Sequence, residues 1–251
     1  MKNQRVVVSS HGGPEVLQVV EEDLPEPGDG EVRVKVFAAG VSAYDLMYRR
    51  SGLLPGTPKV PFTLGLDIVG EVDTLGSGVS TVEPGQRVAA GPRSEGGGYA
   101  AFVCLPEGEL VPVPEGVDSA EAVCVVSDYL TADLMLHQVA EVRSGESILV
   151  QGAAGGVGTA LLELGSLSEL EMYGTASRHN HELVSDLGAT PIDYQTEDFV
   201  ECIRSLTGDG VDVVFDPIGG ARQLWRSYQA LRKGGLVAAR RSALVRKDRW
   251  P

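Results

Sequence analysis

The stretch Ser147-Ile148-Leu149-Val150-Gln151-Gly152-Ala153-Ala154-Gly155-Gly156-Val157-Gly158-Thr159-Ala160 decides the fold of this chain. It begins with an apolar run typical of a buried strand, continues through a glycine-rich turn and ends in small residues that suit a helix start. In a parallel α/β sheet this order presents backbone N–H groups to a pyrophosphate at a helix N-terminus. The spacing reads A-x-G-x-x-G from Ala153 to Gly158, one alanine away from the dinucleotide-binding fingerprint.

This loop supplies the first candidate binding residues. We expect Gly155 to let the backbone approach the phosphates, and Gly158 to allow close packing of helix on strand. The cofactor-binding residues predicted here are Ala154, Gly155, Gly156, Val157 and Gly158. The alternative is a tight strand–helix turn that binds no ligand. The flanking strand and the elements downstream favour the dinucleotide interpretation.

Composition limits the class of protein. The chain has 251 residues, enough for two domains, and a formal net charge of −14 at pH 7, which argues against a nucleic-acid-binding surface. No run of the sequence is long and apolar enough to span a membrane, and the N-terminus lacks the hydrophobic region of a signal peptide. Cys104, Cys124 and Cys202 are isolated, as in a protein of the reducing cytoplasm.

The first part of the chain, residues 1–118, has short alternating apolar segments broken by Gly and Pro, which predicts a mostly antiparallel, barrel-like β domain. A helix is predicted over Ser42 to Arg50. The predicted strands are Arg5–Ser9, Leu17–Glu21, Glu31–Ala39, Asp67–Leu75, Gln86–Ala90 and Gly98–Cys104.

The second part, residues 119–251, alternates helix and strand, which predicts a doubly wound parallel sheet of the Rossmann type. A helix starts at Asp118-Ser119, and a helical pattern covers residues 126–142. Further helices are predicted over Gly158–Leu170, His179–Leu187, Asp198–Thr207 and Arg222–Leu231. Strands after the first are predicted over Glu171–Ala176, Ile192–Tyr194, Val211–Asp216 and Leu236–Ala239.

The charge changes sign at the C-terminal end. The last twelve residues carry five basic side chains and one acidic one, whereas the preceding helix–strand region is acidic. We therefore expect the regular domain to stop near Ala239; a frayed polar tail is the alternative. Five strands make most, but not all, of a six-stranded dinucleotide fold, so its last strand and helix are expected to be missing.

Cofactor choice depends on the end of the second strand of the sheet domain, some 20 residues after the glycine loop. An NAD site would place Asp or Glu there, whereas this chain has Ser177 and Arg178. A hydroxyl can donate to a 2′-phosphate and a guanidinium can pair with it. The sequence therefore favours NADP(H). The alternative for Arg178 is a solvated loop charge.

Several segments together resemble the zinc-independent quinone oxidoreductase branch of the medium-chain dehydrogenase/reductase superfamily, and within it the VAT-1 group. They are residues 39–47, 85–88, 152–158, 174–182, 192–194 and 210–220. The resemblance implies a GroES-like β-barrel at the N-terminus, a Rossmann domain after it and a cleft between the two. It also implies NADPH-dependent hydride transfer to quinones or enones. Members continue past this chain's end with a last strand and helices that return to the barrel.

The resemblance also assigns individual residues. Tyr194 matches a tyrosine stacked near the adenosine, and Thr131 matches a threonine that faces the nicotinamide amide. Ser42 stands in place of a common asparagine at the reacting end. Ser42 and Thr131 are the predicted catalytic residues, although Ser42 also suits a helix cap.

Other positions depart from the family pattern. Zinc-dependent relatives place Cys and a Gly-His-Glu where this chain has Ser42 and Gly65-Leu66-Asp67, so no catalytic metal is predicted. Leu54 and Asp133 stand where tyrosines are usual. Together with Ser42, these departures reduce the expected efficiency of quinone reduction.

Three functions remain open from the sequence. The first is an NADPH-dependent, zinc-independent reductase of quinones or enones, cytoplasmic and dimeric as its relatives often are. The second is a non-catalytic adaptor or lipid-associated protein, peripheral at a vesicle or at the mitochondrial outer membrane. The third is a shortened product that folds poorly and exposes apolar surface.

Overall fold

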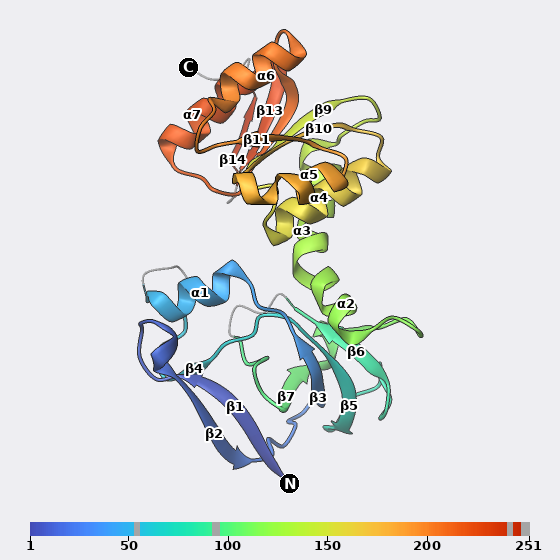
Figure 1. Ribbon diagram of the computed structural model, residues 1–251. Coiled ribbons are helices and arrows are strands. Elements are labelled where there is room, and N and C mark those ends of the chain that lie inside the picture. Colours follow the sequence, from blue (N-terminus) through green and yellow to red (C-terminus); the bar gives the residue numbers. More distant parts are fainter. Residues whose placement is uncertain (53–55, 92–95, 240–242, 247–251) are drawn as a thin grey trace. The chain divides into compact units, whose positions relative to one another are not determined.

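The computed structural model describes residues 1–52, 56–91, 96–239 and 243–246. The chain divides into two compact units, Met1–Ser127 and Asp128–Pro251 (Figure 1). The division falls inside a continuous helical run that begins at Ser119, the first residue of the expected sheet domain. Each unit is described by itself below.

Unit 1 is built from antiparallel strands in two sheets, with strand orders β2-β1-β4 and β7-β3-β5-β6-β8. The strands are β1 (Lys2–Val8), β2 (Leu17–Asp23), β3 (Glu31–Ala39), β4 (Phe62–Thr63), β5 (Ile68–Leu75), β6 (Arg87–Ala90), β7 (Phe102–Pro106) and β8 (Leu110–Pro112). Its helices are α1 (Ala43–Arg50) and α2 (Ser119–Cys124), with short 3-10 turns η1 (Pro14–Val16) and η2 (Glu107–Glu109). The predicted antiparallel β domain is confirmed.

Alternation of apolar residues explains how β3 packs. Val32 and Val34 are fully buried, whereas Lys35, the next residue along the strand, is exposed. The predicted strand Gly98–Cys104 starts too early, since β7 begins at Phe102. Tyr99 N donates instead to Leu64 O at 2.9 Å, which keeps this segment in a loop against residues 63–65. The short strands β4 and β8 were not predicted.

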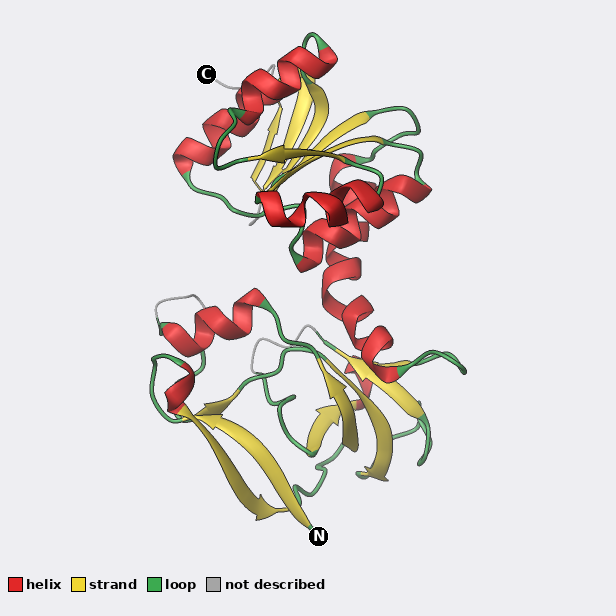
Figure 2. Cartoon of the chain, viewed as in Figure 1, coloured by secondary structure: helices red, strands yellow, loops and turns green. Residues whose placement is uncertain are grey.

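Unit 2 contains a six-stranded sheet with strand order β11-β10-β9-β12-β13-β14. Figure 2 draws its strands in yellow and the helices that pack on them in red. The strands are β9 (Ser147–Val150), β10 (Glu171–Ala176), β11 (Thr190–Asp193), β12 (Val211–Asp216), β13 (Leu231–Ala239) and β14 (Ala243–Arg246). The first five are parallel, as predicted. The sheet continues past Ala239 through β14, an antiparallel edge strand that the sequence did not predict.

The helices of unit 2 also agree with the sequence in number and order. They are α4 (Gly156–Leu167), α5 (His181–Asp186), α6 (Phe199–Thr207) and α7 (Ala221–Ala230), with the 3-10 turn η5 (Arg178–Asn180) before α5. The helical run after α2 consists of η3 (Val125–Tyr129), α3 (Leu130–Asp133) and η4 (Leu134–Ala140). Its η3 and η4 segments are π-helical, which the periodicity did not reveal. Among the described residues, no helix combines the length and apolarity that crossing a bilayer requires.

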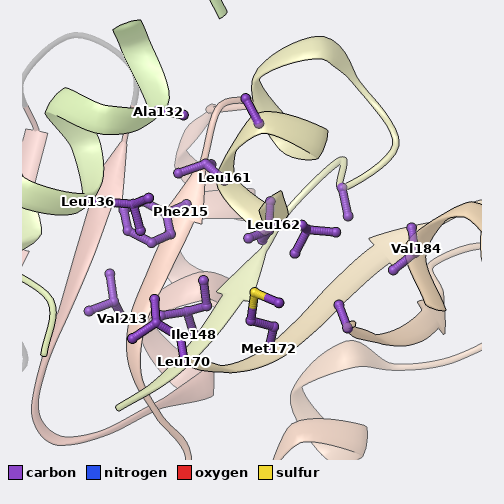
Figure 3. Close-up of a cluster of buried hydrophobic side chains, with 14 of the residues drawn as sticks. Ala132, Leu136, Ile148, Leu161, Leu162, Leu170, Met172, Val184, Val213 and Phe215 are labelled. Atoms are coloured by element: carbon purple, nitrogen blue, oxygen red, sulfur yellow. The ribbon is translucent and has the colours of Figure 1, made fainter. Parts of the chain in front are cut away.

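Helices cover both faces of the sheet in unit 2, which is why β9 is buried along its whole length. Successive β9 side chains point to opposite faces: Ile148 and Val150 join one cluster, and Leu149 joins the other. The first cluster includes Leu161 and Leu162 of α4 and is drawn in Figure 3. The second includes residues of α6 and α7. Because strands β9 to β13 run parallel, their carboxyl ends lie at the same edge of the sheet.

Candidate functional site

The glycine loop connects β9 to α4 at the carboxyl edge of the sheet, in the predicted strand–turn–helix order. Backbone hydrogen bonds fix it to both neighbouring strands. Gln151 N donates to Phe215 O of β12 and Ala153 N donates to Thr175 O of β10, each at 2.9 Å. The loop is therefore held rigidly at the centre of the sheet.

The backbone of the glycine loop is exposed at the point where a phosphate group would bind. Gly155 and Gly156 are exposed, while Ala153 and Gly158 on either side are buried. Ala154 and Val157 pack their side chains against the core beneath. No side chain caps the N-terminus of α4, so the first-turn N–H groups have no side-chain acceptor. Such a helix end attracts anions.

Close backbone contacts explain the glycines. A Cβ on Gly158 would lie 2.4 Å from Gly152 O and 2.8 Å from Ala153 Cα, which is the close packing expected there. Gly152 has a φ of 66°, a conformation that favours glycine. On β10, a Cβ at Gly174 would lie 2.6 Å from Ala153 Cβ, so Gly174 also lets the loop lie close to its neighbour. This role of Gly174 was not predicted.

Two buried polar side chains support the loop from below. Thr175 Oγ1 accepts from Gly152 N at 3.0 Å and donates to Gln151 Oε1 at 2.8 Å. Gln151 and Thr175 are each only 1% exposed, and Gln151 Nε2 has no hydrogen-bond partner among the described residues. Neither role was predicted. The only available signal was a polar residue at each strand end.

Ser177, Arg178 and Tyr194 lie at the same edge. β10 and β11 pair in parallel, with Ala176 opposite Asp193, so Ser177 and Tyr194 directly follow paired residues. Arg178 is exposed, and it forms no ion pair with any residue that the structure describes. Tyr194 is 56% exposed, which leaves its ring accessible. The register thus brings together the three residues predicted for the adenosine end.

A third loop reaches this edge from β12. Asp216 is fully buried; its Oδ1 accepts from Ile218 N at 3.1 Å and from Gly219 N at 3.0 Å, and its Oδ2 accepts from Ser227 Oγ at 2.7 Å. These bonds tie the β12–α7 loop to α7. A shallow pocket of about 450 Å³ lies at the end of this loop and the start of α7. It is lined by Gly219, Gly220, Ala221, Arg222, Gln223 and Arg226. Neither Asp216 nor Ser227 was among the predicted site residues.

Replacing Ser227 tests the importance of this anchor. Ser227→Ala leaves a buried carboxylate with one hydrogen bond fewer, so we expect the free energy of unfolding to fall by about 1 to 2 kcal/mol. Urea denaturation followed by circular dichroism measures it. The matched control is Ser185→Ala, which removes an exposed hydroxyl on α5. Equal stability losses in the two variants would show that the Asp216 contact contributes nothing special.

The two predicted catalytic residues belong to different units. Ser42, in unit 1, is the N-cap of α1, and its N–H and Oγ both donate to Asp45 Oδ2 at 2.8 Å. Asp45 also accepts from Gly65 N at 3.0 Å. Thr131, in unit 2, is half-buried on α3. Within unit 1, the structure therefore gives Ser42 the capping role that the sequence offered as an alternative.

Polar residues around Ser42 form a buried group in unit 1. Tyr99 Oη donates to Gly40 O at 3.1 Å. Burial raises the pKa of the Tyr99 phenol, and the nearby charges of Asp45 and Asp67 raise it further. A Cβ on Gly40 would lie 2.6 Å from Asp67 Oδ1, so the backbone passes close to this carboxyl group. Tyr99 thus stays neutral and donates a hydrogen bond at ordinary pH.

The structure describes most of the positions at which this chain departs from the family pattern. Leu66 is buried in an apolar cluster. In the described ranges, no three His, Cys, Asp or Glu side chains gather as a metal-ligand group. Asp133, which is exposed on α3, lies 3.8 Å from His137 Nε2 through its Oδ1. Leu54 lies outside the described residues.

Comparisons with known proteins agree with this arrangement. The alcohol dehydrogenase GroES-like domain matches residues 28–115, and the zinc-binding dehydrogenase model matches residues 156–239. The chain is 36% identical over 236 residues to the synaptic vesicle membrane protein VAT-1 homolog of Rattus norvegicus, which covers 92% of this chain and 57% of that protein. The chain thus spans little more than half the length of that relative.

Two other relatives are matched over a larger share of their own length. A quinone oxidoreductase of Pseudomonas aeruginosa is 38% identical over 242 residues, covering 94% of this chain and 72% of that protein. A mycobacterial structure described as complexed with NADPH superposes with a TM-score of 0.84 at 32% identity, covering 94% of this chain and 73% of the other. With the GroES-like β unit and the parallel-sheet unit both in place, the chain belongs to the medium-chain dehydrogenase/reductase superfamily and is related to its quinone oxidoreductases and VAT-1 proteins.

Proposed function

We propose that this chain is an NADPH-dependent, zinc-independent oxidoreductase that transfers hydride to a quinone or an enone. The observation that carries the proposal is the exposed, uncapped N-terminus of α4 at Gly155 and Gly156, with Ser177 and Arg178 at the end of the adjacent strand. Residues 119–251 would hold the nicotinamide cofactor and residues 1–118 the acceptor. The NADPH complex of a mycobacterial relative supports this choice of cofactor.

The residues present fit a dinucleotide phosphate. Free N–H groups at the start of α4 suit the diphosphate, and Gly155 and Gly156 leave their surface open to it. Arg178, exposed and without an ion-pair partner in the described part of the chain, suits a 2′-phosphate. Ser177 can donate a hydrogen bond to the same group. No carboxylate occupies the two positions after β10, where it would repel that phosphate.

The protein's own contribution to such a reaction is binding and orientation. When bound, a reduced nicotinamide supplies the hydride. Thr131 would then position the carboxamide of the ring, while Ser42 would face the acceptor. Tyr194 would stack on the adenine. Since hydride transfer to a conjugated carbonyl needs little acid–base chemistry from the protein, a metal ligand set is not required. Leu66, buried and apolar, could not ligate zinc.

Cofactor binding and turnover test the proposal separately. We expect titration of NADPH fluorescence to give a dissociation constant well below millimolar, and NADH to bind more weakly. We expect 1,2-naphthoquinone to accelerate NADPH oxidation, measured by the loss of nicotinamide absorbance. Binding without turnover would favour the alternative function, a non-catalytic VAT-1-like adaptor. Failure of either nucleotide to bind below millimolar concentration would refute the cofactor assignment.

A further inference from the structure

One acidic side chain lies directly against the glycine loop. A Cβ on Gly156 would lie 2.0 Å from Asp128 Oδ2 and 2.7 Å from Asp128 Cγ, so this carboxyl group lies directly against the Cα of Gly156. Asp128 belongs to η3, which lies between α2 and α3 in the chain, and Gly156 is the first residue of α4. Both residues belong to unit 2. A carboxyl group therefore lies at the helix end where a diphosphate would bind.

The neighbouring residue holds Asp128 in this position. The hydroxyl of Tyr129 donates to the carboxylate of Glu163 on α4, and its ring packs against the core cluster beneath α4. These two contacts attach η3 to α4 and to the core beneath it. Asp128 thus keeps its place without a bond of its own.

The carboxyl group of Asp128 lacks compensation. It forms no hydrogen bond or ion pair with any residue in the described ranges, and no side chain caps the amides of α4. It is half-buried, and burial raises its pKa. A carboxylate that served mainly to cap the helix would instead accept from the first-turn N–H groups. Its contact is with the Gly156 Cα side of the turn.

We propose that Asp128 is an affinity-determining residue of the dinucleotide site, whose negative charge opposes the approach of the diphosphate to Gly155 and Gly156. The inference rests on the proposed function, because it concerns the same loop. Two anionic groups on one short turn repel each other, and partial burial of one of them strengthens the repulsion. Neutralising the carboxyl group should therefore strengthen nucleotide binding.

The other charged side chains on α4 and on the helical run after α2 have partners of their own. On helix α4, the carboxylate of Glu163 accepts a hydrogen bond from the hydroxyl of Tyr129. On its own helical run, Asp133 and His137 pair with each other further along. The loop 152–158 carries no titratable side chain. The pKa of Asp128 lies above the ordinary value of about 4, so as the pH falls through it the carboxylate is neutralised and nucleotide affinity should rise.

The test compares Asp128→Asn with the wild-type full chain. Isothermal titration with NADP⁺, which tolerates acid better than NADPH, should show roughly five- to tenfold tighter binding by the variant near neutral pH. The ratio of the two dissociation constants should approach one as the pH falls towards the pKa of Asp128, and should shrink with added salt. Because it is a ratio, the titration of the nucleotide itself cancels.

Two further variants keep the test decisive. Asp128→Ser should also tighten binding if Asn disturbs the packing, and thermal melts show whether each variant folds. Asp186→Asn is the charge control, because it removes an exposed carboxylate on α5 that makes no contact with the loop; its dissociation constant should match the wild type.

The outcomes separate the two proposals. Suppose that the wild type binds NADP⁺ and that both Asp128 variants fold but bind it equally or more weakly. That result would overturn this inference and leave the proposed function standing. Equal tightening by Asp186→Asn would overturn it as well, since the effect would then be one of net charge. Absence of NADP⁺ binding in every variant would overturn the proposed function, and this inference with it.

Discussion

Arg178→Glu should weaken NADPH binding by about 30- to 100-fold and change NADH binding by no more than about twofold. The wild-type guanidinium is exposed at the end of β10 and forms no ion pair in the described part of the chain, so it is available to a 2′-phosphate. The variant loses a charge-assisted hydrogen bond and adds a repelling carboxylate. NADH has no phosphate at that position and should hardly respond. Fluorescence titration of both nucleotides measures the two constants.

A charge control separates this local effect from a general one. Arg143→Glu makes the same change of charge on an exposed side chain that precedes β9, and therefore lies at the amino end of that strand. We expect its NADPH constant to stay within about threefold of wild type, because salt screens charges separated by more than about 10 Å. If Arg178→Glu weakened both nucleotides equally, Arg178 would not contact the 2′-phosphate.

Gly158→Ala should lower the free energy of unfolding by about 2 to 3 kcal/mol and weaken NADPH binding strongly. Its Cβ would lie 2.4 Å from Gly152 O and 2.8 Å from Ala153 Cα, and both of these are backbone atoms. Backbone hydrogen bonds to Phe215 and Thr175 prevent the loop from moving aside. The substitution must therefore push α4 away from β9 or break those bonds. Urea denaturation and NADPH titration measure the two effects.

The control lies three positions earlier in the same loop. Gly155→Ala adds the same methyl group, but its Cβ would meet only Gly152 O, at 3.3 Å, and the backbone at φ −84°, ψ 168° suits any residue. We expect its stability to stay within about 0.5 kcal/mol of wild type. Comparable destabilisation by both variants would mean that close helix–strand packing at Gly158 is not the cause.

Much of unit 2 could be predicted because its signals are local. Glu171–Ala176 and Val211–Asp216 are strands at the predicted bounds, since a short apolar run bounded by polar and glycine residues is sufficient to define a buried strand. Asp198 was predicted at a helix start and caps α6 through its side chain. Gly208 ends that helix with a positive φ.

Other features depended on residues far apart in the sequence. Strand β14 pairs with β13 although the basic charge of residues 240–251 predicted a polar tail there, because an open sheet edge supplies hydrogen-bond partners to any extended segment. Tyr99 was placed in a strand, but its backbone bonds to Leu64 instead. The predicted capping role of Ser42 was one of two alternatives, and only the contact with Asp45 shows that it is made.

The sequence alone determined the order of strands and helices along the chain and the position of the glycine loop, because each depends on periodicity or spacing within a few residues. It also indicated the family, through the resemblance of several short motifs. The tertiary structure alone decided which distant side chains meet that loop: Thr175 and Gln151 beneath it, Asp216 and Ser227 beside it, and Asp128 against Gly156. These contacts follow from strand register and helix packing, which depend on the burial of the whole core and leave no pattern in the local sequence.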